Sequence, residues 1–113
     1  MSDPVAAPAH AASLPPLNAD AVFSALGDPT RRRTLAKLFD RQPRPLNAMG
    51  GTYPKDRDTI RKQLDVLIKS GLVIADNDPT TGRRLIYALA PSVKTETTEQ
   101  GRTMDFGCCV VRL

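Results

Sequence analysis

One amphipathic segment, residues 56–71, constrains the fold of this chain more than any other. Its apolar residues recur at helical spacing and form a single stripe: Ile60, Leu64, Leu67 and Ile68. Most of its other positions carry Asp, Arg, Lys or Gln. Gly71 ends the pattern, as is common at helix C-termini. We therefore expect a helix, capped by Asp56, that buries one side in a core and leaves a cationic side exposed.

Two helices are predicted upstream of this segment. Asn18 is a favourable N-cap for the first, which Gly27 would end as a left-handed C′ residue. Asp28 caps the second, with Pro29 at the first helical position, where a missing N–H costs nothing. We expect this second helix to end near Asp40.

The remaining elements are shorter. A short helix is expected over residues 46–51, followed by a turn that leads into the long helix. Two strands are predicted over residues 72–75 and 85–89, joined by a polar loop that ends in two arginines. The last stretch, residues 104–113, is apolar enough to be a buried strand.

This order of elements predicts a winged helix-turn-helix. The expected fold class is mainly α, with four helices, a small β-hairpin and a strand-like C-terminal tail. We expect a disordered Ala/Pro-rich arm over residues 1–16. The winged helix-turn-helix domain is then residues 17–90, and residues 91–113 are a C-terminal extension.

Charge points to phosphate as a partner. Residues 28–84 hold thirteen Lys and Arg against seven Asp and Glu, in a chain with a formal charge of +4. A basic domain of this kind commonly binds nucleic acid, and a long helix with a free cationic face suits the major groove of duplex DNA.

The residue content of this chain also argues against an enzyme. Its single histidine, His10, lies in the predicted arm, away from any Ser or Cys that it could activate. We expect no cofactor and no histidine metal cluster. No apolar run is long enough to span a membrane and no signal peptide is recognisable, so we expect a cytoplasmic protein.

Three segments resemble the ArsR family of winged-helix repressors. They are ALGDPTRRRTLAKL (residues 25–38), DTIRKQLDVLIKSGLV (58–73) and GRRLIYAL (82–89). The resemblance implies a homodimer that binds a near-palindromic double-stranded DNA operator and acts as a repressor. It also implies that the first helix and the C-terminal tail form much of the dimer contact. The sequence does not identify an effector.

The predicted DNA-binding residues come from the long helix and from the loop between the two strands. They are Arg57, Thr59, Arg61, Lys62, Gln63, Arg83 and Arg84. Arg61 or Lys62 would suit guanine and Gln63 would suit adenine, by bidentate hydrogen bonding. The arginines at 31–33 could touch phosphate or form salt bridges within the fold.

Cys108 and Cys109 leave two interpretations open. They could form a thiolate site for arsenite or another soft metal, or a redox switch, and so make the protein a metal-responsive repressor. Alternatively, they are small apolar side chains in a buried strand. We favour this second interpretation because free cysteines are usually buried. Neighbours on a strand point to opposite faces, so two sulfurs there would not converge without a turn.

Two other functions remain as alternatives. Winged helices also serve as protein-interaction modules, but such a module would expose apolar residues on the long helix, where this chain has Arg, Lys and Gln. An RNA-binding winged domain would bring exposed aromatic side chains for base stacking. Tyr53 and Tyr87 are the only tyrosines, and Tyr87 is expected in the core.

Overall fold

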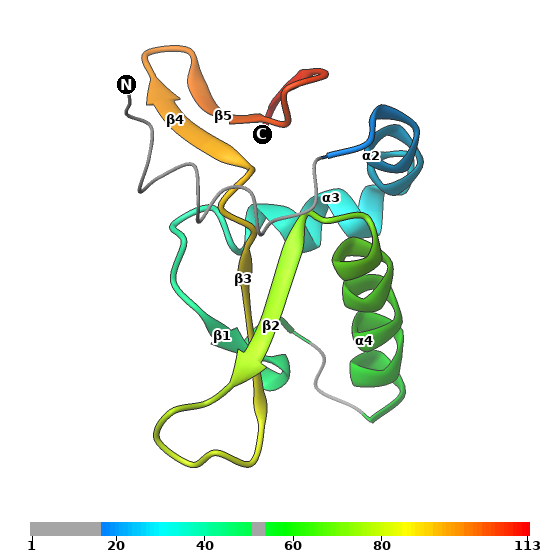
Figure 1. The fold of residues 1–113 in the computed structure, drawn as a ribbon, viewed down its shortest axis with the longest axis vertical. Coiled ribbons are helices and arrows are strands. Elements are labelled where there is room, and N and C mark those ends of the chain that lie inside the picture. Colours follow the sequence, from blue (N-terminus) through cyan, green and yellow to red (C-terminus); the bar gives the residue numbers. More distant parts are fainter. Residues whose placement is uncertain (1–16, 51–53) are drawn as a thin grey trace, which may run out of the picture.

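The fold combines three α-helices with two small antiparallel sheets (Figure 1). A computed structural model describes residues 17–50 and 54–113. The predicted arm, residues 1–16, and part of the turn before the long helix therefore lie outside the described residues. The helices are α2 (Ala19–Leu26), α3 (Pro29–Ala36), α4 (Pro54–Lys69) and the short 3-10 helix η1 (Leu46–Ala48). The strands are β1 (Arg44–Pro45), β2 (Val73–Asn77), β3 (Leu85–Leu89), β4 (Lys94–Thr98), β5 (Gly101–Asp105) and β6 (Val110–Arg112).

The predicted helix starts at Asn18 and Asp28 are confirmed. The Asn18 side chain accepts a hydrogen bond from the Ala21 N–H, and the Asp28 side chain accepts one from the Thr30 N–H. The helix ends differ from the prediction. Gly27 keeps a right-handed φ of −69°, so it is not a left-handed C′ residue. The second helix, α3, ends at Ala36 instead of near Asp40, because the following residues tighten into i→i+3 turns.

The long helix α4 begins two residues earlier than predicted. Asp56 therefore lies in its first turn and is not its N-cap. The apolar stripe is confirmed, since Leu64 and Leu67 are fully buried and Ile60 and Ile68 pack against the core.

The first sheet has the strand order β1-β3-β2 and forms the wing (Figure 1). Strands β2 and β3 pair antiparallel with Val73 opposite Leu89 and Asn77 opposite Leu85. The short strand β1 adds to the other edge of β3, with Pro45 opposite Ile86. The predicted hairpin is thus present with a third strand, because residues just before η1 pair with it.

The second sheet, β4-β5-β6, contradicts the predicted fold class. The mainly α interpretation is wrong, because the described residues form two three-stranded antiparallel sheets beside the three α-helices. Residues 91–101, for which no strand was predicted, contain all of β4 and the turn into β5. The threonines of this stretch are β-branched and therefore favour strands. Gly101 takes a φ of +123° just after the tight turn that joins β4 to β5. The predicted third helix is also reduced, to the single 3-10 turn η1.

One hydrophobic core joins both sheets to the helices. Val93, Met104 and Phe106 of the C-terminal part are buried in the same cluster as Leu35 and Leu64. Arg41 adds a polar link, because its guanidinium donates to the Val93 carbonyl at 2.8 Å and to the Ala90 carbonyl at 3.1 Å. The C-terminal sheet is therefore anchored to the helices and is more than a single strand-like tail.

Candidate nucleic-acid interface

The wing loop between β2 and β3 is organised by Asp78. Its carboxylate accepts hydrogen bonds from the Thr80 N–H at 2.9 Å and from Arg84 Nε at 3.0 Å. The Asp78 N–H donates to the Arg84 carbonyl at 2.8 Å, and Gly82 turns the chain with a φ of +67°. The Thr80 N–H, and after it Arg84, lower the pKa of the Asp78 carboxyl group. Arg83 is exposed in this closed loop, next to Arg84, which is held at the base.

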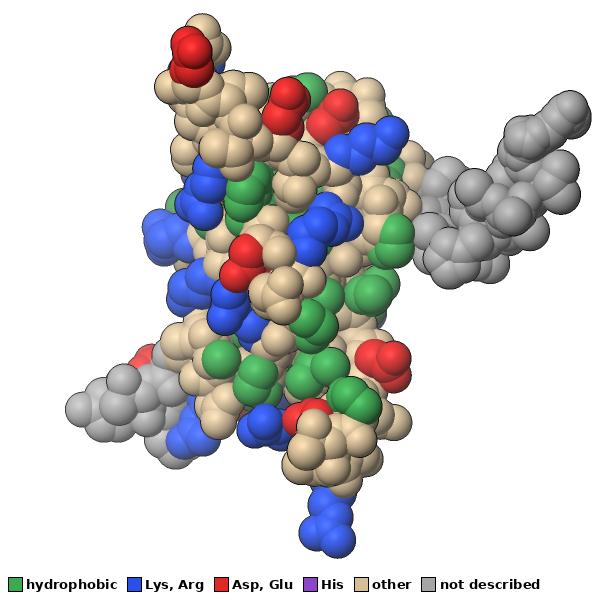
Figure 2. All heavy atoms as spheres, turned by 90° about the vertical axis from the view of Figure 1, so that its left-hand side faces the viewer, with side chains coloured by type: hydrophobic (Ala, Val, Ile, Leu, Met, Phe, Trp, Pro, Cys, Tyr) green, Lys and Arg blue, Asp and Glu red, His purple; other side chains and the backbone are tan. Residues whose placement is uncertain are grey.

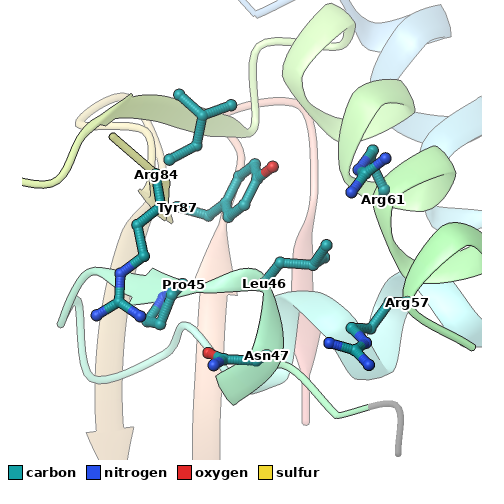
Figure 3. Close-up of a pocket in the computed structure, with 8 residues that line it drawn as sticks. Pro45, Leu46, Asn47, Arg57, Arg61, Arg84 and Tyr87 are labelled. Atoms are coloured by element: carbon teal, nitrogen blue, oxygen red, sulfur yellow. The ribbon is translucent and has the colours of Figure 1, made fainter. Parts of the chain in front are cut away.

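A groove of about 440 Å³ runs between α4 and the wing sheet. Arg57 and Arg61 line it from α4, and Arg84 lines it from the other side (Figure 3). Its remaining lining residues come from the β1–η1 segment and from β3: Pro45, Leu46, Asn47, Leu85 and Tyr87. Three of the seven residues predicted to bind DNA therefore share one groove.

Arg57 differs from the other two arginines of the groove. It is half-buried, and its Nε atom is buried without a hydrogen-bond partner in the described part of the chain. Arg61 is exposed and makes a long ion pair with Asp58, at 3.8 Å. Arg84 is held by Asp78 but is still 54% exposed. All three guanidinium groups thus keep unused donors near the groove.

Tyr87 forms the wall of the groove that faces α4. Tyr87 is buried, as predicted, and in Figure 3 its hydroxyl group points towards α4. Burial raises the pKa of this phenol, Asp65 raises it further, and Arg61 partly offsets both. Tyr87 and Asn47 were not predicted as site residues, because each reaches the groove through strand β3 or turn η1 from a distant part of the chain.

The exposed side of α4 presents Thr59 and Lys62 to solvent beside Arg61. Gln63 lies differently, because its side-chain oxygen accepts a hydrogen bond from Arg31 Nη1 at 2.9 Å. Bidentate recognition of adenine needs both the oxygen and the nitrogen of the amide, and here the oxygen is engaged within the fold.

Arg31 is a structural residue of this interface. Its guanidinium donates to the Ala25 carbonyl at 2.7 Å, to the Ser24 carbonyl at 3.1 Å and to the Asp28 carboxylate at 3.3 Å. It therefore caps the end of α2 and connects that helix to Gln63 on α4. Residues 31–33 were predicted either to touch phosphate or to form salt bridges within the fold. Arg31 makes its contacts within the fold, including the one to Asp28.

The cysteines lie in a turn and not within a strand. The Phe106 N–H donates to the Cys109 carbonyl at 2.9 Å, and Gly107 has a φ of +86°. Cys108 is exposed and Cys109 is half-buried. Burial raises the pKa of the Cys109 thiol, and the neighbouring Cys108 and Asp105 raise it further. A raised pKa keeps the thiol protonated, which disfavours it as a metal ligand or nucleophile.

Residues 17–50 and 54–113 were also searched for groups of metal-ligating side chains and for helices that could span a membrane. In these ranges no group of three or more His, Cys, Asp or Glu side chains could hold a metal ion. No described helix has the length and apolar composition that a membrane span requires.

On the face drawn in Figure 2, which is the left-hand side of Figure 1 and not the side of α4, basic side chains are unevenly distributed. Figure 2 shows them gathered along one edge at mid-height, with a further one at the lower tip, where Figure 1 has the wing loop. Phosphate groups are attracted by such concentrations of positive charge.

Comparison with known proteins identifies the fold family. Residues 34–103 match the family model described as "Transcription factor tau 138 kDa subunit, extended winged helix". This range runs from the second half of α3 through the wing and into β5, so the C-terminal strands are part of the match. A search of curated proteins gave no match. The chain belongs to the extended winged-helix family of the transcription factor tau 138 kDa subunit.

Proposed function

We propose that this chain is a sequence-specific regulator of transcription that binds double-stranded DNA through α4 and the wing loop. The observation that carries the proposal is the groove that Arg57 and Arg61 line from α4 and Arg84 lines from the opposite side. Guanidinium groups bind phosphate through charge-assisted hydrogen bonds, and the major groove of B-DNA is wide enough for a helix. The winged-helix family of the chain, with its link to transcription, supports the same function.

The buried Nε of Arg57 supports a phosphate site in this groove. Leaving a buried donor without an acceptor costs about 1–3 kcal/mol, and more when the group is charged. A phosphate oxygen of the DNA backbone entering the groove would supply the missing acceptor. DNA binding would then relieve a cost that the free chain carries.

The proposed division of labour follows the exposure of each side chain. Thr59, Arg61 and Lys62 would reach base edges from the open side of α4, with Arg61 or Lys62 reading guanine. Arg83, an exposed residue of the wing loop, would contact the minor groove or its phosphates. Gln63 would contribute its free amide group at the edge of the interface.

Within this proposal the chain is a homodimeric repressor of the ArsR kind. A single small winged domain reads few base pairs, so a two-fold dimer on a near-palindromic operator would increase specificity. Exposed apolar side chains support a dimer contact through α2 and the extension 91–113, namely Phe23, 53% exposed, and Val110, 62% exposed. Sedimentation equilibrium tests this contact: a monomer at concentrations that saturate the operator would contradict it.

An interaction module without DNA readout is less well supported. Val66 is the exposed large apolar side chain of α4, at 38%, whereas the rest of that face is charged or polar. One apolar residue does not make the continuous patch that a docking helix needs.

The proposal is tested by measuring duplex binding after single cations are removed. A tight-binding duplex is first selected from random sequences, and its affinity is then measured by fluorescence anisotropy. Arg61→Ala and Arg83→Ala are each expected to weaken binding about tenfold, and the affinity of the wild type is expected to fall steeply with salt.

Lys94→Ala is the matched control, because Lys94 is an exposed cation on β4, outside the proposed interface. It should bind the duplex as the wild type does at moderate salt. If Arg61→Ala and Arg83→Ala stay folded and also bind as the wild type does, the proposed interface is wrong.

A further inference from the structure

A second cluster of arginines lies on a different face, between α3 and the C-terminal sheet. Arg32 and Arg33 of α3 and Arg102 and Arg112 of β5 and β6 line a groove of about 330 Å³. The groove has an apolar surface as well, since Ala36, Val111 and Leu113 also line it. None of its described lining residues has an acidic side chain.

The four guanidinium groups have no carboxylate partner among the described residues. Arg32 donates to the Leu26 carbonyl, and Arg33 donates to the Thr30 hydroxyl at 3.4 Å. Arg102 lies over the Phe39 ring, 4.9 Å from its centre. Arg112 donates to the Gln100 side-chain oxygen at 3.5 Å.

Four neighbouring positive charges repel one another and destabilise the folded chain, and a bound anion would offset that repulsion. Each guanidinium keeps several unused donors after these contacts. The cluster is also distinct from the proposed DNA interface. Figure 1 shows β5 and the red C-terminal segment at the opposite end of the long axis from the wing loop. That axis extends over 52 Å, so a duplex lying across the wing end would not reach β5 and β6.

We propose that this groove binds an acidic segment of another protein, one that alternates carboxylate side chains with aliphatic ones. The four arginines would bind the carboxylates in bidentate pairs, and the surface formed by Ala36, Val111 and Leu113 would bury the aliphatic side chains. The sugar–phosphate backbone of a nucleic acid has no aliphatic side chain to bury against that surface, which favours a peptide over nucleic acid.

Two occupants from this chain fit less well. The residues 1–16 contain a single acidic side chain, Asp3, which could not neutralise four arginines. A two-fold contact centred on this groove would bring two sets of four arginines together, and like charges across an interface are strongly disfavoured. The dimer contact proposed above rests on Phe23 and Val110, which do not line the groove.

The experiment measures the binding of two labelled probes to the full chain. One is a fluorescein-labelled peptide of alternating glutamate and leucine, and the other is the selected DNA duplex. The double variant Arg33→Gln/Arg102→Gln is expected to weaken peptide binding about tenfold and to leave duplex affinity unchanged. Arg83→Gln on the wing loop should do the opposite, and a peptide with lysine in place of glutamate should not bind the wild type.

Three results would overturn the inference. The wild type could fail to bind the glutamate peptide, or the double variant could bind it as tightly as the wild type. The double variant could instead lose duplex affinity, which would assign the cluster to DNA phosphates. The single variant Arg33→Gln, whose one hydrogen bond to Thr30 is long, provides the same test if the double variant does not fold. Failure of the wing variant alone would affect only the proposed DNA interface.

Discussion

At the scale of single residues, Asp78 gives the wing loop a dependence on pH. The Thr80 N–H and the Arg84 guanidinium hold its pKa below the ordinary aspartate value, so the folded loop prefers the ionised form. This stabilisation is present above the ordinary pKa, about 4, and is lost as pH falls through the lowered value in the folded loop. Arg84 should then be released from the base of the wing.

Nuclear magnetic resonance of the Thr80 amide and the Arg84 side chain between pH 7 and pH 3 measures this change. The readout has to be local, because Gln42 and Arg44 also lower the pKa of Asp40. The Asp78→Asn variant should lose the transition at the wing and keep the one at Asp40. A wing transition that persists in Asp78→Asn would contradict the assignment.

At the scale of elements, the two glycines at the ends of α2 and α4 differ in backbone conformation. Gly27 is right-handed, and an added Cβ would meet its nearest atoms at 3.4 Å and 3.5 Å, ordinary contact distances. Gly71 has a φ of +83°, and its Cβ would lie 3.3 Å from Leu17. Gly27→Ala should therefore raise the free energy of unfolding by about 0.4–1 kcal/mol. Gly71→Ala should lower it by about 1–2 kcal/mol, the cost of a left-handed alanine.

Urea denaturation of the two alanine variants measures both effects, and each variant controls for the other. Equal changes of the same sign would mean that α2 and α4 end in the same way, contrary to the backbone angles.

Much of this local organisation follows from the sequence. Caps such as Asn18 and Asp28 act on neighbours two or three residues away, and the stripe of α4 repeats at helical spacing, so both were predicted. The C-terminal sheet was not predicted as a sheet. Its strands are held by pairing across the chain, as between Thr95 and Met104, and by burial of Phe106 in a core that the helices supply.

The candidate interface shows the same division between local and distant determinants. The basic residues of α4 and the wing were predicted from their charge and position. Their grouping into a groove depends on β1 pairing with β3, which brings Asn47 and Tyr87 beside Arg57. The bond from Arg31 to Gln63 joins residues 32 positions apart and has no pattern in the sequence.

At the scale of the whole molecule, one core serves both the winged helix and the C-terminal sheet. Phe106 is 2% exposed and belongs to the cluster that includes Leu64 of α4. Phe106→Ala should lower the free energy of unfolding by about 3–5 kcal/mol and destabilise both parts together. Lys94→Ala, at an exposed site of β4, should change it by no more than about 0.5 kcal/mol.

Hydrogen exchange of backbone amides separates the two possibilities for Phe106→Ala. A shared core predicts faster exchange in α4 as well as in β4–β6. Faster exchange confined to β4–β6 would mean that the extension folds as an independent unit.

The central claim is that α4 and the wing loop together form the DNA-binding surface. Chemical-shift mapping of the full chain with its selected duplex tests it most directly, because it reports on every backbone amide and arginine side chain at once. The account predicts that the perturbed signals cluster at Arg57, Arg61 and Arg83, with those of β4–β6 unchanged. Perturbation confined to β4–β6, with α4 and the wing loop unaffected, would contradict it.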